Sequence, residues 1–328
     1  MNILLMTVLF IPILLSMGSL YEWTHPDFVA AHELVAAKTG YLNVPFFIIR
    51  AIIYFGLWIL GTLYYVRQGR AQDSGSDPDI RRRLQRNAAP WMVIYVLTMT
   101  FAMVDWPMSL TPEWFSGIYP VTIMISQAIS GISLIIVTMV MLARRHADLD
   151  MLLTSKRLQD LGNFLMAFSI FWAYVNFSQI IILWSNNIVE TNTWYVLRFG
   201  LEWRAVGIFL LFFGFFGTFL ILLSRWVKRK RRALTLVAIW ALIVQLVNIF
   251  YIVVPSYHQL ISEGEEGVMH IAAGKVSGLE LWLDLALIVG MGGIWLWFYV
   301  RQLSSQALVP VHDPRIEPSL KSKVVSHG

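Results

Sequence analysis

Residues 210–232 read Leu210-Leu-Phe-Phe-Gly-Phe-Phe-Gly-Thr-Phe-Leu-Ile-Leu-Leu-Ser-Arg225-Trp-Val-Lys-Arg-Lys-Arg-Arg232. An apolar run ends in a segment, 225–232, in which six of eight residues are Lys or Arg. About 20 apolar residues cross the ~30 Å hydrocarbon layer of a bilayer, and basic residues gather at the cytoplasmic ends of such spans. The stretch therefore predicts a membrane-spanning helix that ends on the cytoplasmic side.

Similar apolar runs recur along the chain and predict an all-α polytopic transmembrane protein with about eight spans. The first run could instead be a signal peptide, but it lacks a basic start and a small-x-small cleavage site. The predicted spans cover roughly 3–20, 44–66, 89–106, 113–143, 158–184, 205–225, 232–255 and 278–302.

The basic residues predict how these spans are oriented. Of 25 Lys and Arg, 20 fall in segments that alternating topology places on one face, four fall on the other, and Arg50 lies inside a span. We therefore expect both termini in the cytoplasm. The mean hydropathy is +0.64 and only 14% of residues are charged, against about 25% in soluble domains. The net charge of +5 favours anionic lipid headgroups, and not nucleic acid, as a partner.

The spans group into four predicted parts. Residues 1–106 form a helical bundle of three spans, and 107–256 form a four-helix bundle. Residues 257–303 hold an outward loop and the final span, and 304–328 form a cytoplasmic tail.

Several kinds of chemistry are excluded or disfavoured by composition. Cysteine is absent, which excludes disulfides, cysteine-ligated iron–sulfur clusters and a thiol nucleophile. All seven histidines fall in predicted loops or the tail, so we expect no haem, iron–sulfur cluster or metal bound by this chain. P-loop, zinc-protease and dinucleotide-binding motifs are missing from the sequence.

Two charges are predicted at membrane depth on the outward side. Arg50 lies about two turns into the second span, and Asp105 ends the third. A charge in hydrocarbon costs about 2.5–3.5 kcal/mol on insertion scales, so we expect the two to pair across neighbouring helices. Such a pair is either a structural device that fixes helix register or a proton-entry or quinone-headgroup site.

Polar residues also punctuate the fifth span and its neighbours, and they suggest a proton or water path. Asp160 is equally explained as an acid that complements the helix dipole, and membrane Asn and Ser often serve only as interhelical hydrogen bonds of about 0.6 kcal/mol. The predicted path comprises Asp160, Ser169, Asn176, Gln179, Gln127, Gln245 and Asn248.

Six strings, in order along nearly the whole chain, resemble the membrane quinone-binding subunits of bacterial alternative complex III. These subunits belong to the polysulfide-reductase-like membrane proteins, and the chain is most similar to the second, smaller one. The strings are Tyr21-Glu-Trp-Thr-His-Pro26, Tyr41-Leu-Asn-Val-Pro-Phe-Phe-Ile-Ile-Arg50, Asp105-Trp-Pro-Met-Ser-Leu110, Asp160-Leu-Gly162, Phe171-Trp-Ala-Tyr-Val-Asn-Phe-Ser-Gln179 and Leu222-Leu-Ser-Arg225.

The resemblance implies a ten-span fold with two four-helix bundles, of which the first two spans are absent here. It implies a subunit of a quinol:cytochrome c oxidoreductase in the bacterial inner membrane that is not catalytic alone. The substrate would be menaquinol or ubiquinol, and the partners an iron–sulfur subunit, cytochrome c subunits and a homologous membrane subunit. By position, Trp23, His25, Arg50 and Asp105 become the candidate quinone and proton site.

Two positions depart from that pattern. Gly214 stands where the resemblance leads us to expect His, and Asn248 stands where it leads us to expect Asp. Both changes remove titratable groups from the second bundle and favour an alternative: a non-catalytic scaffold that anchors peripheral redox subunits. A secondary transporter is a third class, but it requires inverted repeats and broken helices, which the sequence does not clearly display.

Overall fold

The computed structural model describes residues 2–74, 78–186, 189–257, 259–263, 269–273 and 278–304. The chain divides into two compact units, Met1–Asp105 with Val276–Gly328, and Trp106–Lys275. Both units are built from helices, apart from one short hairpin, and the all-α polytopic prediction is confirmed. The predicted cytoplasmic tail, beyond Ser304, lies outside the described residues.

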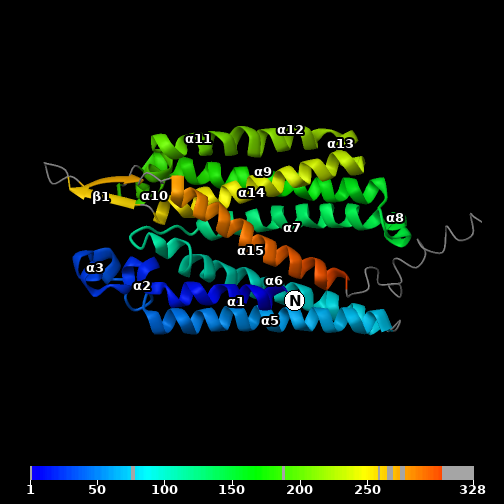
Figure 1. Cartoon of the computed structure of the whole chain (residues 1–328), viewed down its shortest axis with the longest axis horizontal. Helices are drawn as coiled ribbons and strands as arrows, with labels where there is room; N and C mark the ends of the chain where they lie inside the picture. The colour runs from blue at the N-terminus through cyan, green and yellow to red at the C-terminus, as the bar shows by residue number, and fades with distance from the viewer. Residues whose placement is uncertain are drawn as a thin grey trace, which may run out of the picture. The chain divides into compact units, whose positions relative to one another are not determined.

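Unit 1 places long helices beside a set of short ones (Figure 1). The long helices α5 and α6 pack on each other, and α1 packs on both α5 and α15. Ala51 and Ala102, both almost fully buried, lie on α5 and α6. The elements are α1 (Asn2–Leu15), α2 (Met17–Leu20), η1 (Glu22–Thr24), α3 (Pro26–Ala31), α4 (Glu33–Ala36), α5 (Val44–Ser74), α6 (Pro78–Asp105) and α15 (Gly278–Ser304).

Unit 2 is centred on α7, which packs against α14 and α9 (Figure 1). Ile136 and Leu165, fully buried on α7 and α9, and Leu234, fully buried on α14, belong to its core. The elements are η2 (Met108–Leu110), α7 (Tyr119–Ala143), α8 (Ala147–Leu152), α9 (Ser155–Asn186), α10 (Val189–Phe199), α11 (Leu201–Phe209), η3 (Leu210–Gly217), α12 (Thr218–Leu223), α13 (Arg225–Arg229), α14 (Arg231–Tyr257), β1 (Gln259–Glu263) and β2 (Met269–Ala273).

Seven described helical segments are long and apolar enough to cross a membrane, one fewer than the sequence suggested. The exception is the first apolar run. Its helix α1 has 14 residues and ends at Leu15, so it is about 21 Å long, short of a ~30 Å hydrocarbon layer. The break falls at Ser16, whose backbone is not helical (φ −102°, ψ 18°) and whose Oγ donates to Pro12 O at 2.7 Å.

The sixth predicted span contains a stretch of π-helix, η3, between α11 and α12. Within this wider turn Phe213 O accepts a hydrogen bond from Trp240 Nε1 of α14, at 3.1 Å. Gly214 lies so close to α14 that a Cβ atom added to it would be 2.9 Å from Val244 Cγ1. A glycine at 214 therefore allows the two helices to approach closely.

Large apolar side chains face outward from the spans. No residue in the apolar window of α15 is buried, and Val289 on that helix is 72% exposed. On α5, Ile52 and Leu60 are likewise exposed. Exposed apolar surface along whole helices is the pattern expected where lipid is the solvent.

Candidate functional site

A buried ion pair joins α5 to α6 at the level where α6 ends. Arg50 Nε donates to Asp105 Oδ2 at 2.8 Å, and Arg50 Nη2 donates to Asp105 Oδ1 at 2.9 Å. Arg50 is 6% exposed and Asp105 is fully buried. The planar guanidinium matches both carboxylate oxygens, which is the strongest geometry for such a pair. The pairing expected from the sequence is therefore present in unit 1.

Local sequence places both partners. The residue before a proline is disfavoured in a helix, so Asp105-Trp-Pro107 ends α6 with the carboxylate in its last turn. Arg50 lies in the second turn of α5, whose start is fixed by Asn43: its Oδ1 accepts from Phe46 N at 3.0 Å. The two helix ends therefore bring the charges together.

Aromatic rings cover the guanidinium. Arg50 Cζ lies 3.9 Å from the centre of the Tyr41 ring and 4.2 Å from that of Phe46. Arg50 Nη1 also donates to Tyr41 O at 3.0 Å. A desolvated cation on aromatic faces gains roughly 2 kcal/mol, so these rings stabilise the charge away from water.

A tyrosine holds the carboxylate from the other side. Tyr54 lies one turn beyond Arg50 on α5, and its hydroxyl donates to Asp105 Oδ2 at 2.8 Å. That oxygen thus accepts from both a cation and a phenol. A hydrogen bond to a charged group contributes about 1.5–3 kcal/mol, so Tyr54 fixes the carboxylate in place.

The segment that precedes α5 contributes an aromatic cluster beside the pair. The rings of Tyr21, Trp23 and Phe47 lie with their centres 5.4–5.7 Å apart. Phe47 is fully buried, one turn before Arg50 on α5. Burial, and then the charge of Asp105, raise the pKa of Tyr21, and burial is also the first cause that raises the pKa of Tyr41. Both phenols therefore remain protonated donors at neutral pH.

The four predicted site residues are thus only partly brought together. Arg50 and Asp105 are bonded, and Trp23 packs on Phe47 of the same helix as Arg50. His25 is exposed, and its Nε2 lies 2.6 Å from the backbone oxygen of Gly18 in the short helix α2. Its ring is held by that carbonyl rather than by the ion pair.

In unit 2, part of the predicted path forms a buried cluster between α7 and α14. Asn248 Nδ2 donates to Ser126 Oγ at 3.0 Å and to Gln245 Oε1 at 3.3 Å. All three are at most 5% exposed. Gln127, next to Ser126, is half-buried on α7. The cluster is neutral, and the Ser126 hydroxyl donates in turn to Thr122 O of its own helix at 2.9 Å.

On α9, two of the predicted path residues bond to the backbone of their own helix instead of to another helix. Ser169 Oγ donates to Leu165 O, and Asn176 Nδ2 donates to Trp172 O, both at 2.8 Å and both within the helix. Gln179 Oε1 accepts from Ser116 Oγ at 3.3 Å, whereas Asp160 is exposed. Over the described part of α9, these side chains do not form a continuous hydrogen-bonded file.

Sequence reasoning did not single out a second buried cation, Arg198. Arg198 is fully buried, and its guanidinium lies 3.4 Å from the Trp194 ring centre. Its Nε donates to Tyr251 O at 3.2 Å and its Nη2 to Ser256 Oγ at 2.8 Å; Nη2 also donates to Ile252 O. Burial lowers the pKa of Arg198 to about 9, so it remains a cation at neutral pH.

The partners of Arg198 follow from helix chemistry. Pro255 has no N–H, so the carbonyl of Tyr251, four residues earlier on α14, lacks its helical donor. Arg198 supplies that donor, and its charge faces the negative end of α14. Two sequence features could have indicated that Arg198 is buried: the proline near the end of a predicted span, and Trp194 four residues before Arg198.

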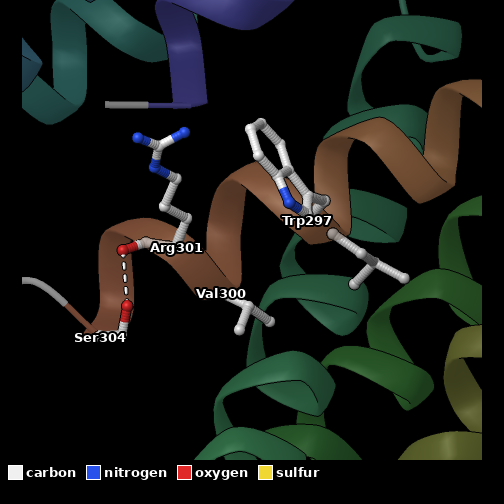
Figure 2. A pocket seen from close by; sticks show the side chains of 5 residues that line it. Trp297, Val300, Arg301 and Ser304 are labelled. Atoms are coloured by element: carbon white, nitrogen blue, oxygen red, sulfur yellow. Dashed lines mark hydrogen bonds between the residues drawn. The ribbon is translucent and has the colours of Figure 1, made fainter.

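A surface hollow of about 650 Å³ lies beside α15, and Figure 2 shows the side chains that line it. Its lining comes from that one helix: Leu296, Trp297, Val300, Arg301 and Ser304. Ser304 Oγ donates to Arg301 O at 2.9 Å, and the Arg301 guanidinium lies 5.3 Å from the Trp297 ring centre. The polar groups are thus engaged with one another on a single exposed face. Across the residues that the structure describes, no group of three His, Asp or Glu is placed to hold a metal ion.

Fold and composition together define an all-α polytopic membrane protein. No protein-family model matches the chain, and no curated protein matches it.

Proposed function

We propose that the chain is a membrane subunit of a quinol-oxidising respiratory complex of the alternative complex III type. In this proposal it contributes to quinol binding, proton conduction or both, and is not catalytic alone. It lies in the bacterial inner membrane with both termini in the cytoplasm. Its partners are an iron–sulfur subunit, cytochrome c subunits and a homologous membrane subunit, and menaquinol or ubiquinol is the substrate.

The observation that carries the proposal is the buried pair of Arg50 and Asp105 at the end of two spans. A charged pair at membrane depth is costly and marks a functional site by default. Here Tyr41 and Phe46 cover the guanidinium and Trp23 packs on Phe47 of the same helix, and aromatic surroundings of this kind suit a flat quinone ring. Site and apolar surroundings thus match a substrate with a polar head and a lipid-soluble tail.

Each residue has a role in this chemistry. Oxidation of a quinol to a quinone releases two protons and two electrons. A carboxylate such as Asp105 accepts a hydroxyl proton, and Arg50 offsets negative charge on the headgroup. His25, exposed in the outward loop, passes protons to water. The electrons leave to the partner subunits, because the chain has no cysteine to bind an iron–sulfur cluster.

The polar residues of unit 2 belong to the proposal as a proton path from the cytoplasm, beginning at Asp160. Its weakest step is α9, where Ser169 and Asn176 are bonded to their own helix. A path there requires these side chains to exchange their carbonyl partners for water.

One observation favours the second candidate, a non-catalytic scaffold. The cluster of Ser126, Gln245 and Asn248 is neutral and joins α7 to α14 by hydrogen bonds, and the backbone at Gly214 packs closely against Val244. These features stabilise packing without requiring any proton transfer.

Purification of the tagged chain from mild-detergent membranes tests the proposal. We expect haem-containing and iron–sulfur subunits to co-purify, and the preparation to reduce cytochrome c with added quinol. A chain that purifies without redox subunits and without this activity contradicts both candidates. Redox partners that co-purify, with activity insensitive to substitutions at Arg50 and Asp105, favour the scaffold.

A further inference from the structure

One end of unit 2 concentrates positive charge. Residues 144–160 and 225–232 hold ten Lys and Arg against three Asp, whereas the whole chain carries a net charge of only +5. Figure 1 shows α8 and α13 at this same end of α7, α9 and α14. Because candidate spans end here, this charge lies where a membrane surface would be.

The short helix α13 is held at this end by a buried lysine. Extended backbone at Ser224 and Lys230, with ψ of 118° at both, separates α13 from α12 and α14. Lys228 is 5% exposed, and its Nζ donates to Asn163 Oδ1 of α9 at 2.8 Å. Gly162 makes room for it, since a Cβ there would lie 2.8 Å from Lys228 Cγ.

Little negative charge offsets the remaining bases. Arg229 Nε donates to the neutral amide of Gln159 at 2.8 Å, and Arg231 pairs with Asp150. Three further bases, Arg225, Lys230 and Arg232, are exposed and have no ion-pair partner among the residues that the structure describes. Trp226, between them in sequence, is 64% exposed.

We propose that the α13 surface, formed by Arg225, Trp226, Lys230 and Arg232, binds the phosphate headgroup of an anionic phospholipid. An exposed indole beside cations at the end of a span is the arrangement found at membrane interfaces. Leu223, the last residue of α12, is 53% exposed, so the apolar surface of this candidate span continues up to the basic residues. This apolar continuation favours a lipid over an acidic protein. Each base near an anionic surface strengthens binding about fivefold.

The test uses the full chain, delipidated in a neutral detergent, and a fluorescent phosphatidylglycerol followed by anisotropy. We expect phosphatidylglycerol to bind and phosphatidylcholine not to bind. The variant Arg225→Gln/Lys230→Gln/Arg232→Gln should bind phosphatidylglycerol about 100-fold more weakly. The matched control, Arg67→Gln/Arg82→Gln/Arg86→Gln in unit 1, removes the same charge from exposed positions and should bind within about twofold of the unmodified chain.

Circular dichroism and the elution volume check that both variants fold; if the triple variant does not, Lys230→Gln alone should weaken binding about fivefold. Equal binding of phosphatidylcholine, or equal losses in the two triple variants, overturns the proposal. Displacement of the lipid by equimolar glycerol 3-phosphate assigns the surface to a soluble phosphate instead. Displacement by an equimolar ten-residue Glu peptide at physiological salt assigns it to an acidic protein.

Discussion

Arg50 and Asp105 are 55 residues apart in sequence and are joined by two hydrogen bonds of 2.8 and 2.9 Å. Neither is accessible to bulk water. The pair ties α5 to α6 and sets Arg50, which lies inside a predicted span, opposite an acidic partner on the next helix.

Loss of one member of this pair should destabilise unit 1. Arg50→Met leaves Asp105 buried without its cation, and breaking such a pair costs about 3–5 kcal/mol. Thermal unfolding of the detergent-solubilised chain measures the change. The double variant Arg50→Met/Asp105→Leu should recover most of the loss, because no charge then remains buried. A single variant as stable as the unmodified chain would show that the pair does not support the fold.

Tyr54 should position the carboxylate. Tyr54→Phe removes the hydroxyl that donates to Asp105 Oδ2, at a cost of about 1.5–3 kcal/mol in stability. In the assembled complex we expect quinol oxidation to fall, but by less than on substitution of Asp105 itself. Tyr174→Phe, at a 66% exposed position on α9, is the control and should change neither quantity. If the two variants have the same stability and the same rate of quinol oxidation, Tyr54 does not position the carboxylate.

Gly214 should tolerate no side chain. Gly214→Ala places a Cβ 2.9 Å from Val244 Cγ1, and overpacking of this kind costs about 1–3 kcal/mol. Val244→Ala in the same chain should restore part of the stability. Gly131→Ala on α7, where no atom lies within 4 Å of the added Cβ, should be neutral or stabilising. Thermal unfolding separates these cases, and a neutral Gly214→Ala contradicts the close approach of η3 to α14.

Arg198 should hold the end of α14. Arg198→Lys keeps the charge but cannot reach the carbonyls of Tyr251 and Ile252 together with the Ser256 hydroxyl. We expect a loss of about 3 kcal/mol and faster hydrogen exchange in the last turns of α14. Arg204→Lys, exposed on α11, is the matched control. Unchanged exchange in the Arg198 variant would mean that α14 ends stably without it.

The spans were readable from the sequence because lipid imposes length and hydropathy on each helix separately. The pairing of Arg50 with Asp105 was also predictable, since the two lie toward the ends of consecutive spans that meet on the same side. Tyr54 follows Arg50 by one turn, but its bond to Asp105 required knowledge of how α5 and α6 are rotated.

Other features depend on long-range contacts that no local pattern records. The burial of Arg198 needs α10 to fold against the carbonyl that Pro255 frees at the end of α14. The packing of α15 on α1 brings together helices that lie far apart in the sequence. The first apolar run had the composition of a span, but its interruption at Ser16 left α1 too short.

The most direct measurement of the central claim is quinol:cytochrome c turnover by the assembled complex that carries Asp105→Asn. Asparagine keeps the shape of the side chain but cannot accept the quinol proton, so we predict a decrease of about 100-fold or more. The control Asp148→Asn, exposed on α8, should retain full turnover in a complex of the same subunit composition. Full turnover by an intact Asp105→Asn complex would contradict the assignment of this site to quinol oxidation.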